Sequence, residues 1–359
     1  MRVRHSPQTM RALPKYQLAE IYARLRRAVT AGQIADAIAL LQLAVPVDLP
    51  AVTGEAIALA LHEQLQPALT YRGFKPAELA MLADDVKPVL KLEDLPVAEA
   101  QRFMERFHGQ YRILPSETFT KDYLLMRTQP ARSTDSAAMM NLYVSRGQQG
   151  ADLQALERER PEACEESGAL LGFPPCCTQA FAQDFRRSRE DQDTVNDDAT
   201  RRLVDQATPQ NPGHAWLNPL SDLEPIGCYA CTPHCENALN LANKSVKALE
   251  NRRPDLLPLM QTWLTAPTLV WRLPFFLIFE GHAQGEGIAY TRVRANAFPD
   301  PLVRRVQALF AAALIPVLAQ GNWLAVRENH LEIQKDGKIV HQLNLLGLPP
   351  ALSAWHDGR

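Results

Sequence analysis

Leu171-Gly-Phe-Pro-Pro-Cys-Cys-Thr178 and Cys228-Tyr-Ala-Cys-Thr-Pro-His-Cys235 are the two stretches on which the interpretation of this chain depends. Together they hold five of the six cysteines in 359 residues. Proline stands just before or among the cysteines in both, and proline suits the first turn of a helix, where its missing N–H would otherwise lack a partner. We therefore predict two helix N-termini that carry thiols, one helix over residues 176–186 and one from Pro233 to about Asn251.

Helix N-termini favour negative charge, because their first N–H groups lack backbone partners and the helix dipole is positive there. A thiol in such a position loses its proton more easily than a free thiol. Several thiolates on two neighbouring helix starts would attract a cation or a cationic cluster. The predicted cofactor ligands share these positions: Cys176, Cys177, Cys231 and Cys235. Cys228 is a fifth candidate metal ligand, and as an alternative a nucleophile.

The number and spacing of these thiols leave three kinds of site open. Cys228-x-x-Cys231-x-x-x-Cys235 together with the adjacent Cys176 and Cys177 offers more thiols than one tetrahedral ion needs. Neighbouring side chains on a helix diverge by about 100°, so we expect the pair to suit an iron–sulfur cluster better than one zinc ion. A 4Fe-4S cluster is therefore the first hypothesis. A single zinc ion and a set of redox-active or free thiols are the alternatives.

Composition excludes several classes of function. The formal net charge of −2 gives no basis for nucleic-acid binding. No run of apolar residues reaches the length of a membrane helix, and the basic start of the chain has no apolar segment behind it, so we expect no secretory signal. A cytoplasmic location follows as an expectation. Clustered cysteines in that compartment indicate metal or redox chemistry more often than disulfides.

The periodicity of the whole chain predicts an α+β protein with three consecutive domains after a loose tail over residues 1–13. Residues 14–113 show helical spacing and predict an antiparallel helical array. Residues 114–265 form the central cysteine-site domain. Residues 266–359 predict a small antiparallel sheet beside one long helix that begins near Asp300.

Four further residues are candidates for acid–base chemistry near the thiols. His214 lies in a loop rich in proline and asparagine that could cover the cysteines, and His234 stands between two of them. Glu280 and His282 follow the most apolar strand of the C-terminal region, where we predict a turn over residues 281–287. A loop at that point could bring an acid–base pair to the cysteine site.

The cysteine motifs resemble the signature of an uncharacterised prokaryotic family, Gly-Tyr-Pro-x-Cys-Cys-x-x-x-Phe followed by His-x-Pro-Cys-Ser-x-x-Cys. The first motif corresponds to Gly172, Phe173, Pro174, Cys176, Cys177 and Phe181, and the second to Cys231, Thr232 and Cys235. Ala230 stands where the family has proline, and Cys228 where it has histidine. A cysteine keeps the ligand capacity of that histidine. The resemblance, over about residues 139–249, implies a shared site and no particular reaction.

Three hypotheses about function follow from the sequence. The first is an iron–sulfur enzyme of unknown substrate. The second is a module without catalytic activity, in which zinc stabilises the structure and the helical array binds a protein partner. The third is a thiol or sulfur-handling redox protein that uses Cys228 and Cys231. Within each, the partner is a small molecule or a protein, with no nucleic acid and no membrane.

Overall fold

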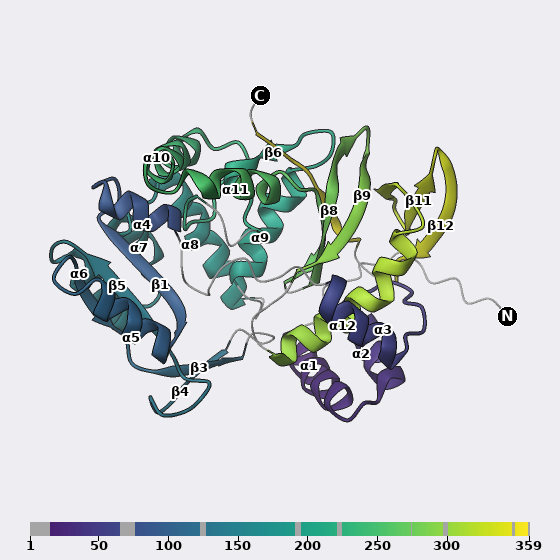
Figure 1. Ribbon diagram of the computed structural model, residues 1–359, viewed down its shortest axis with the longest axis horizontal. Helices are drawn as coiled ribbons and strands as arrows, with labels where there is room; N and C mark the ends of the chain where they lie inside the picture. Colours follow the sequence, from purple (N-terminus) through teal and green to yellow (C-terminus); the bar gives the residue numbers. More distant parts are fainter. Residues whose placement is uncertain are drawn as a thin grey trace. The chain divides into compact units, whose positions relative to one another are not determined.

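The computed structural model describes residues 15–64, 76–122, 127–190, 195–220, 225–273, 275–296, 301–346 and 349–357. The chain forms two compact units. The sheet unit comprises residues 1–67, 191–193 and 267–352, and the cysteine unit comprises residues 68–190, 194–266 and 353–359. Helices and strands contribute to both units (Figure 1), so the fold class is α+β, as the sequence predicts.

A seven-stranded antiparallel sheet forms the centre of the sheet unit. Its strands lie in the order β12-β11-β10-β9-β8-β7-β13. Most neighbours in the sheet are also neighbours in the sequence, which is typical of a meander joined by hairpins. The bounds are β7 Thr268–Arg272, β8 Phe275–Gln284, β9 Gly287–Ala295, β10 Trp323–Val326, β11 His330–Lys335, β12 Lys338–Asn344 and β13 Ala351–Ser353.

The long helix α12 (Pro301–Leu318) covers this sheet and links it to the first helices of the chain. It packs against β9 and against α1 (Lys15–Thr30), α3 (Gly54–Leu59) and the π-helical turn η1 (Ala60–Gln64), while α2 (Ile34–Ala44) packs on α1. Its Phe310 is fully buried, with Trp271 and Phe275 both at ring-centroid distances of 5.5 Å. Among the described residues, α12 included, no helix has the length and apolar character of a membrane-spanning segment.

The predicted division into three consecutive domains differs from this arrangement. The first helices of the predicted array belong with the C-terminal sheet, because their apolar faces pack on α12. Residues 76–113 of the predicted array belong instead with the cysteine unit. Helical periodicity identifies which face of a helix is buried, but it does not identify the distant segment that buries it.

The cysteine unit contains a five-stranded sheet around β5 (Met139–Ser145). β5 is buried along most of its length and pairs antiparallel with three strands. These are β1 (Val89–Pro96), β2 (Arg112–Pro115) and β3 (Phe119–Asp122), and β4 (Arg127–Pro130) extends the sheet beyond β3.

β1 corrects the prediction of a helical array over residues 14–113, because Val89–Pro96 form a strand. Leu90 and Leu92 are buried, and between them Lys91 forms an ion pair with Glu157 at 3.0 Å. This alternation is the period of a strand with two different faces. Pro88 also argues against a helix at this point, since a residue before proline disfavours helical geometry.

The helices of the cysteine unit pack on and beside this sheet (Figure 1). They are α4 (Pro76–Ala83), α5 (Val97–Arg106), α6 (Gln149–Glu159), α7 (Cys164–Leu170), α8 (Pro175–Glu190), α9 (Val195–Gln206), α10 (Glu236–Arg252) and α11 (Leu257–Leu264), with short 3₁₀ turns η2 (Ala215–Leu217) and η3 (Pro254–Leu256). A short parallel pair joins β6 (Gly213–His214) to β14 (Trp355–His356). Thus both predicted cysteine-bearing segments lie in one unit.

The close packing of α7 on α8 depends on a glycine. A Cβ atom added to Gly168 of α7 would lie 2.0 Å from Cγ2 and 2.9 Å from Cβ of Thr178 on α8. Neither atom is the end of a flexible side chain, so the two helices would have to move apart. Because α8 carries the first cysteine pair, this packing also sets the position of that pair.

We expect Gly168→Ala to destabilise the cysteine unit by about 1–3 kcal/mol, the usual cost of overpacking a close contact. Denaturant unfolding followed by circular dichroism would measure the loss. Gly168→Ala with Thr178→Ser is the matched partial rescue: serine removes the methyl group at 2.0 Å and leaves the Cβ contact at 2.9 Å. It also keeps the hydroxyl that bonds to the Pro175 carbonyl at 2.9 Å. Equal unfolding midpoints for wild type and Gly168→Ala would contradict the packing argument.

Candidate metal centre

The turn before the first cysteine pair is fixed by the end of α7. Gly172 has φ +75°, a left-handed conformation that glycine adopts without steric cost. The N–H of Phe173 donates to the Gly168 carbonyl at 2.9 Å, and the N–H of Gly172 donates to the Ala169 carbonyl at 3.0 Å. This pair of bonds is the Schellman ending of a helix. It reverses the chain and delivers the two prolines to the start of α8.

Cys176 and Cys177 occupy the first turn of α8, as the proline pattern predicts. Pro174 lies just before the helix, and its carbonyl accepts the N–H groups of Cys177 at 2.9 Å and Thr178 at 3.1 Å. Cys177 is buried and Cys176 is half-exposed. The pair therefore presents one thiol to the interior and one toward the surface.

The second segment, which we call the cysteine loop (residues 228–235), differs from the prediction. Its helix α10 begins at Glu236, so Cys235 is the N-cap residue. Thr232 and Pro233 instead lie in a tight turn, where the Cys235 N–H donates to the Thr232 carbonyl at 3.2 Å. Cys231 therefore stands in the loop, one turn before the helix. The proline marks the turn that leads into the helix rather than its first residue.

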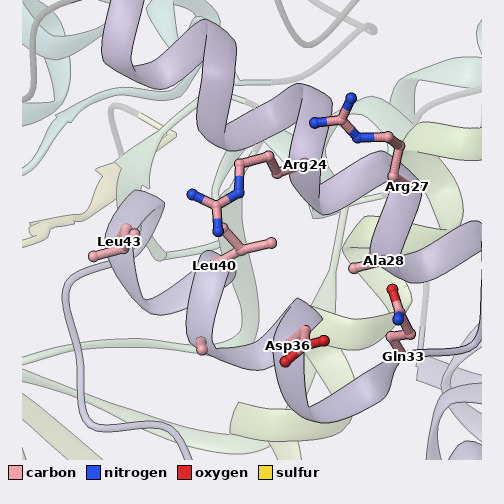
Figure 2. A pocket seen from close by; sticks show the side chains of 8 residues that line it. Arg24, Arg27, Ala28, Gln33, Asp36, Leu40 and Leu43 are labelled. Atoms are coloured by element: carbon pink, nitrogen blue, oxygen red, sulfur yellow. The ribbon is translucent and has the colours of Figure 1, made fainter.

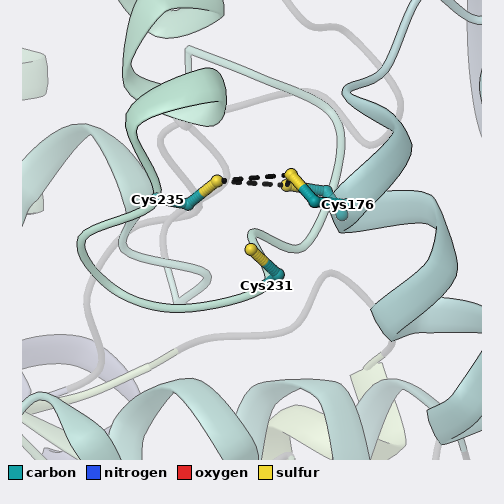
Figure 3. A group of neighbouring side chains, drawn as sticks. Cys176, Cys231 and Cys235 are labelled. Carbon is teal, nitrogen blue, oxygen red and sulfur yellow. Dashed lines mark hydrogen bonds between the residues drawn. The ribbon is translucent and has the colours of Figure 1, made fainter.

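Four sulfur atoms from the two segments meet in one place. The ligand atoms of Cys176, Cys177, Cys231 and Cys235 all lie within 4.8 Å of one another. The Cys235 sulfur is 3.7 Å from both Cys176 and Cys177. Figure 3 shows Cys176, Cys231 and Cys235 pointing into a common space from the helix α8, the loop and the start of α10. This arrangement is compatible with a cysteine-ligated metal site.

The adjacent cysteines approach each other more closely than their divergence on a helix led us to expect. The sulfur atoms of Cys176 and Cys177 are 3.9 Å apart. The Cα–Cβ bonds diverge, but each side chain has its own χ1 rotation, and staggered rotamers can turn both sulfur atoms toward one point. An adjacent pair in the first turn of a helix can therefore offer two corners of a small tetrahedron.

The half-exposed thiol is the one most prone to ionise. Burial alone would raise the pKa of Cys176, but hydrogen bonds from the Asn237 amide and from the neighbouring thiols hold this pKa below its ordinary value. Asn237 Nδ2 lies 3.6 Å from the Cys176 sulfur. Asn237 stands in the first turn of α10, so the second helix start stabilises negative charge on a thiol of the first.

The other three thiols of the group hold their protons more firmly. The hydrogen-bond contact with Cys228, followed by burial, raises the pKa of Cys177. Burial raises the pKa of Cys231 and of Cys235. Cys228 therefore lies beside the group, against Cys177, without being one of the four sulfur atoms that share the common space. Protonated thiols at these three positions are the low-charge state expected when no cation compensates them.

One face of α8 holds the cysteine loop. Cys177, Phe181 and Asp184 recur at helical spacing, and the Phe181 ring stacks on Tyr229 at a centroid distance of 5.9 Å and an interplanar angle of 6°. Asp184 is fully buried and binds Arg202 of α9 at 2.9 Å. Arg202 and Asp184 were not predicted from the sequence. The available signal was the spacing of Asp184 from Cys177, two helical turns apart on the same face.

A buried ion pair lies against both cysteine-bearing segments. Lys87 and Glu78 are 2.8 Å apart, and each side chain is only 2% exposed. The Lys87 ammonium lies 4.5 Å from the ring centroid of Phe173, just before the first pair. A Cβ atom on Gly227 would lie 1.8 Å from a Glu78 carboxylate oxygen, so the chain before the cysteine loop approaches Glu78 closely.

The two predicted histidines lie near the cysteine loop but outside the sulfur group. The N–H of His214 donates to the Pro233 carbonyl at 3.0 Å, and its Nδ1 accepts the N–H of Trp216 at 3.2 Å. Burial, followed by the neighbouring His356 ring, lowers the pKa of His214. His234 is exposed. The structure thus gives His214 a hydrogen-bonding role in the loop, and a catalytic role for either residue stays a prediction.

Glu280 and His282 lie on a strand, which corrects the predicted turn over residues 281–287. β8 continues to Gln284, and only residues 285 and 286 remain for the hairpin turn. Gly281 marks an irregularity in the strand, where a Cβ atom would lie 2.0 Å from the Ala289 carbonyl oxygen. Glu280 forms an ion pair with Arg294 at 2.8 Å in the sheet unit. Their proposed action on the thiols stays a prediction.

The sheet unit has a separate surface groove of about 470 Å³ between α1 and α2 (Figure 2). It combines two guanidinium groups, one carboxylate and an apolar floor. None of its lining residues is a cysteine or a histidine, so the groove differs in chemistry from the sulfur group. The lining residues are Arg24, Arg27, Ala28, Gln33, Asp36, Ala39, Leu40 and Leu43.

Comparison of the chain with protein-family models, with curated proteins and with solved structures finds no match. The resemblance to the uncharacterised prokaryotic family therefore stays a prediction from the two motifs.

The pKa differences predict selective alkylation. In chelator-treated protein at pH 7, iodoacetamide should modify Cys176 faster than Cys164, because the thiolate is the reactive form and the pKa of Cys176 is lowered, whereas burial raises that of Cys164. Both are half-exposed, which makes Cys164 a matched control. Mass spectrometry of the peptides would give both rates. The ratio of the Cys176 rate to the Cys164 rate should fall as the pH rises, because Cys164 then also ionises. Faster labelling of Cys164 than of Cys176 at pH 7 would refute this account.

Proposed function

We propose that this protein is a metalloprotein in which Cys176, Cys177, Cys231 and Cys235 bind a single zinc ion that cross-links the start of α8 to the cysteine loop. The observation that carries the proposal is the separation of the sulfur atoms. Three of these separations are 3.7, 3.7 and 3.9 Å. Zinc–sulfur bonds of about 2.3 Å in a tetrahedron place the sulfur atoms about 3.8 Å apart.

Iron–sulfur chemistry fits these distances less well. In a Cys₄-ligated cluster the thiolates are distributed over several iron atoms, so their sulfur atoms lie farther apart than around one ion. The α8 start and the cysteine loop would have to separate to admit such a cluster. Their contacts oppose this movement, because Phe181 stacks on Tyr229 and Arg202 connects the loop to Asp184.

A closed set of four thiolates supports a structural role for the ion. Catalytic zinc sites keep one position for water or substrate, whereas Cys₄ sites are typically structural. The ion would contribute folding free energy to the cysteine unit, since the metal-binding residues come from distant segments. The activity of the protein would then reside in binding a partner, as in the zinc-stabilised interaction module among the hypotheses.

An iron–sulfur enzyme is the second candidate, and one observation favours it. Cys228 touches Cys177, so five thiols stand where one tetrahedral ion needs four. A spare thiol could serve as an alternative ligand or as a nucleophile toward a substrate. The two candidates differ in metal content, so one measurement separates them.

We expect wild-type protein purified without oxygen to be colourless and to contain about one zinc per chain, because the four thiols define one tetrahedral site. Zinc, iron and acid-labile sulfide should be assayed together. Cys235→Ser should lose the metal, because Cys235 approaches both members of the adjacent pair. Cys164→Ser is the matched control outside the group and should retain it.

Each other outcome has a defined meaning. Brown protein with iron and sulfide would replace zinc with the iron–sulfur candidate. Protein without metal in any preparation, with every cysteine titratable, would exclude both. Cys228→Ser should retain zinc, because Cys228 lies outside the group of four, whereas loss of the ion in this variant would make Cys228 a ligand.

Zinc uptake should release at least three protons per chain at pH 7. The pKa values of Cys177, Cys231 and Cys235 are raised, so these thiols are protonated before the ion binds, and zinc binds thiolates. The apparent affinity should therefore increase as the pH rises and decrease as it falls. Titration in weak buffer with a pH-sensitive dye measures the release. Uptake without proton release would show that the thiols are not the ligands.

A further inference from the structure

Arg202 of α9 bonds to two consecutive carbonyls of the cysteine loop. Its Nη1 donates to the carbonyl of Ala230 at 2.7 Å and to that of Cys231 at 2.6 Å. Its Nε donates to Oδ2 of Asp184 at 3.0 Å. The planar guanidinium thus joins two consecutive loop carbonyls to a carboxylate on α8, a fork that a lysine side chain cannot reproduce.

The bond to the Ala230 carbonyl determines where the Cys231 N–H points. The two groups belong to one peptide, and in a trans peptide the C=O and N–H bonds point in opposite directions. With the oxygen held by Arg202, the N–H is directed away from α9 and toward the thiols. The backbone N–H of Cys231 makes a hydrogen-bond contact with Cys177.

We propose that Arg202 is a positioning residue of the cysteine centre: it holds the peptide between Ala230 and Cys231, so that the Cys231 N–H is directed toward Cys177 and the Cys231 side chain reaches the metal site. This inference rests on the proposed function for the ion itself. The hydrogen bonds of Arg202 end on two loop carbonyls and on Asp184, so Arg202 acts on the sulfur atoms through the loop backbone. Asp184 is its anchor, because a fully buried carboxylate fixes the guanidinium in place.

The hydrogen bonds of Arg202 also stabilise the negative charge that a metal–thiolate centre would carry. Four thiolates around one divalent ion carry a net charge of about −2, and hydrogen bonds from oriented donors stabilise such charge in a buried site. Arg202 places its positive charge one peptide away, where it polarises the carbonyl and strengthens the N–H of that peptide as a donor. It cannot itself become a ligand of the ion, since a guanidinium has no lone pair to give.

The test is metal affinity in the full-length chain, with zinc competed against a chromophoric chelator. Arg202→Gln should lower the affinity about 10- to 100-fold, the usual effect of losing an outer partner of a metal ligand. Arg202→Lys should lie between this variant and wild type, because it keeps the charge and loses the fork. Arg201→Gln is the matched control, since Arg201 is the preceding residue on α9 and pairs with Asp205 at the surface.

Two further readouts separate positioning from general stabilisation. In cobalt-substituted protein, the sulfur-to-cobalt charge-transfer band should shift in Arg202→Gln and Arg202→Lys, because the N–H donor to one thiolate has moved. Loss of stability alone would lower the fraction of protein that holds cobalt, without moving the band. Amide hydrogen exchange in metal-free protein should accelerate over residues 229–232 in both variants and stay unchanged in Arg201→Gln.

The outcomes distinguish this inference from the proposed function. If wild type binds neither zinc nor cobalt, the proposed function fails, and the exchange measurement alone then decides whether Arg202 orders the loop. If wild type binds zinc and both Arg202 variants match its affinity, band position and exchange, the inference is wrong while the metal site stands. Should Arg202→Gln not fold, Arg202→Lys carries the same test.

Discussion

The stacking of the cysteine loop along one face of α8 is the contact on which the site depends. Cys177, Phe181 and Asp184 follow one another at helical spacing, and they meet in turn the loop thiols, the Tyr229 ring and, through Arg202, the loop carbonyls. The three contacts differ in kind, and each of them fixes the position of the loop along the helix. Without this register Cys231 would not reach the adjacent pair, and the chain would carry cysteines without a common site.

That register in turn depends on features that hold α8 itself. Gly168 allows α7 to approach it at the position of Thr178, and Gly172 reverses the chain so that α8 begins where it does. The Lys87–Glu78 pair is buried against both Phe173 and Gly227. A buried ion pair contributes little net stability compared with apolar packing, but it tolerates few alternative geometries. Because the pair contacts the chain just before each cysteine-bearing segment, it holds both segments in position.

Parts of this arrangement could be read from the sequence because they are local. Proline before Cys176 predicts a helix start, and the clustering of five cysteines predicts that their segments meet. The remainder depends on tertiary context. The Pro233 turn delays α10 to Glu236, because a residue that suits the first turn of a helix suits a tight turn equally well. The alternation of buried and polar residues around Lys91 indicates a strand, but the helical spacing on both sides favours a helix. Gly281 is typical of a turn, yet it lies in an irregular strand. Arg202 lacks any local signal, since its partners come from α8 and from the loop.

The structure also explains how adjacent cysteines can share one small site. In the first turn of α8 no preceding turn lies beside the side chains, so rotamers that are crowded in a helix interior are open to both residues. The N–H groups of that turn and the Asn237 amide favour charge on the sulfur atoms, while the guanidinium of Arg202 acts from the far side of a peptide. Charge is thus compensated by donors that leave the sulfur lone pairs accessible. A cation can then enter without displacing a competing positive group, which is the property that a thiolate metal site requires.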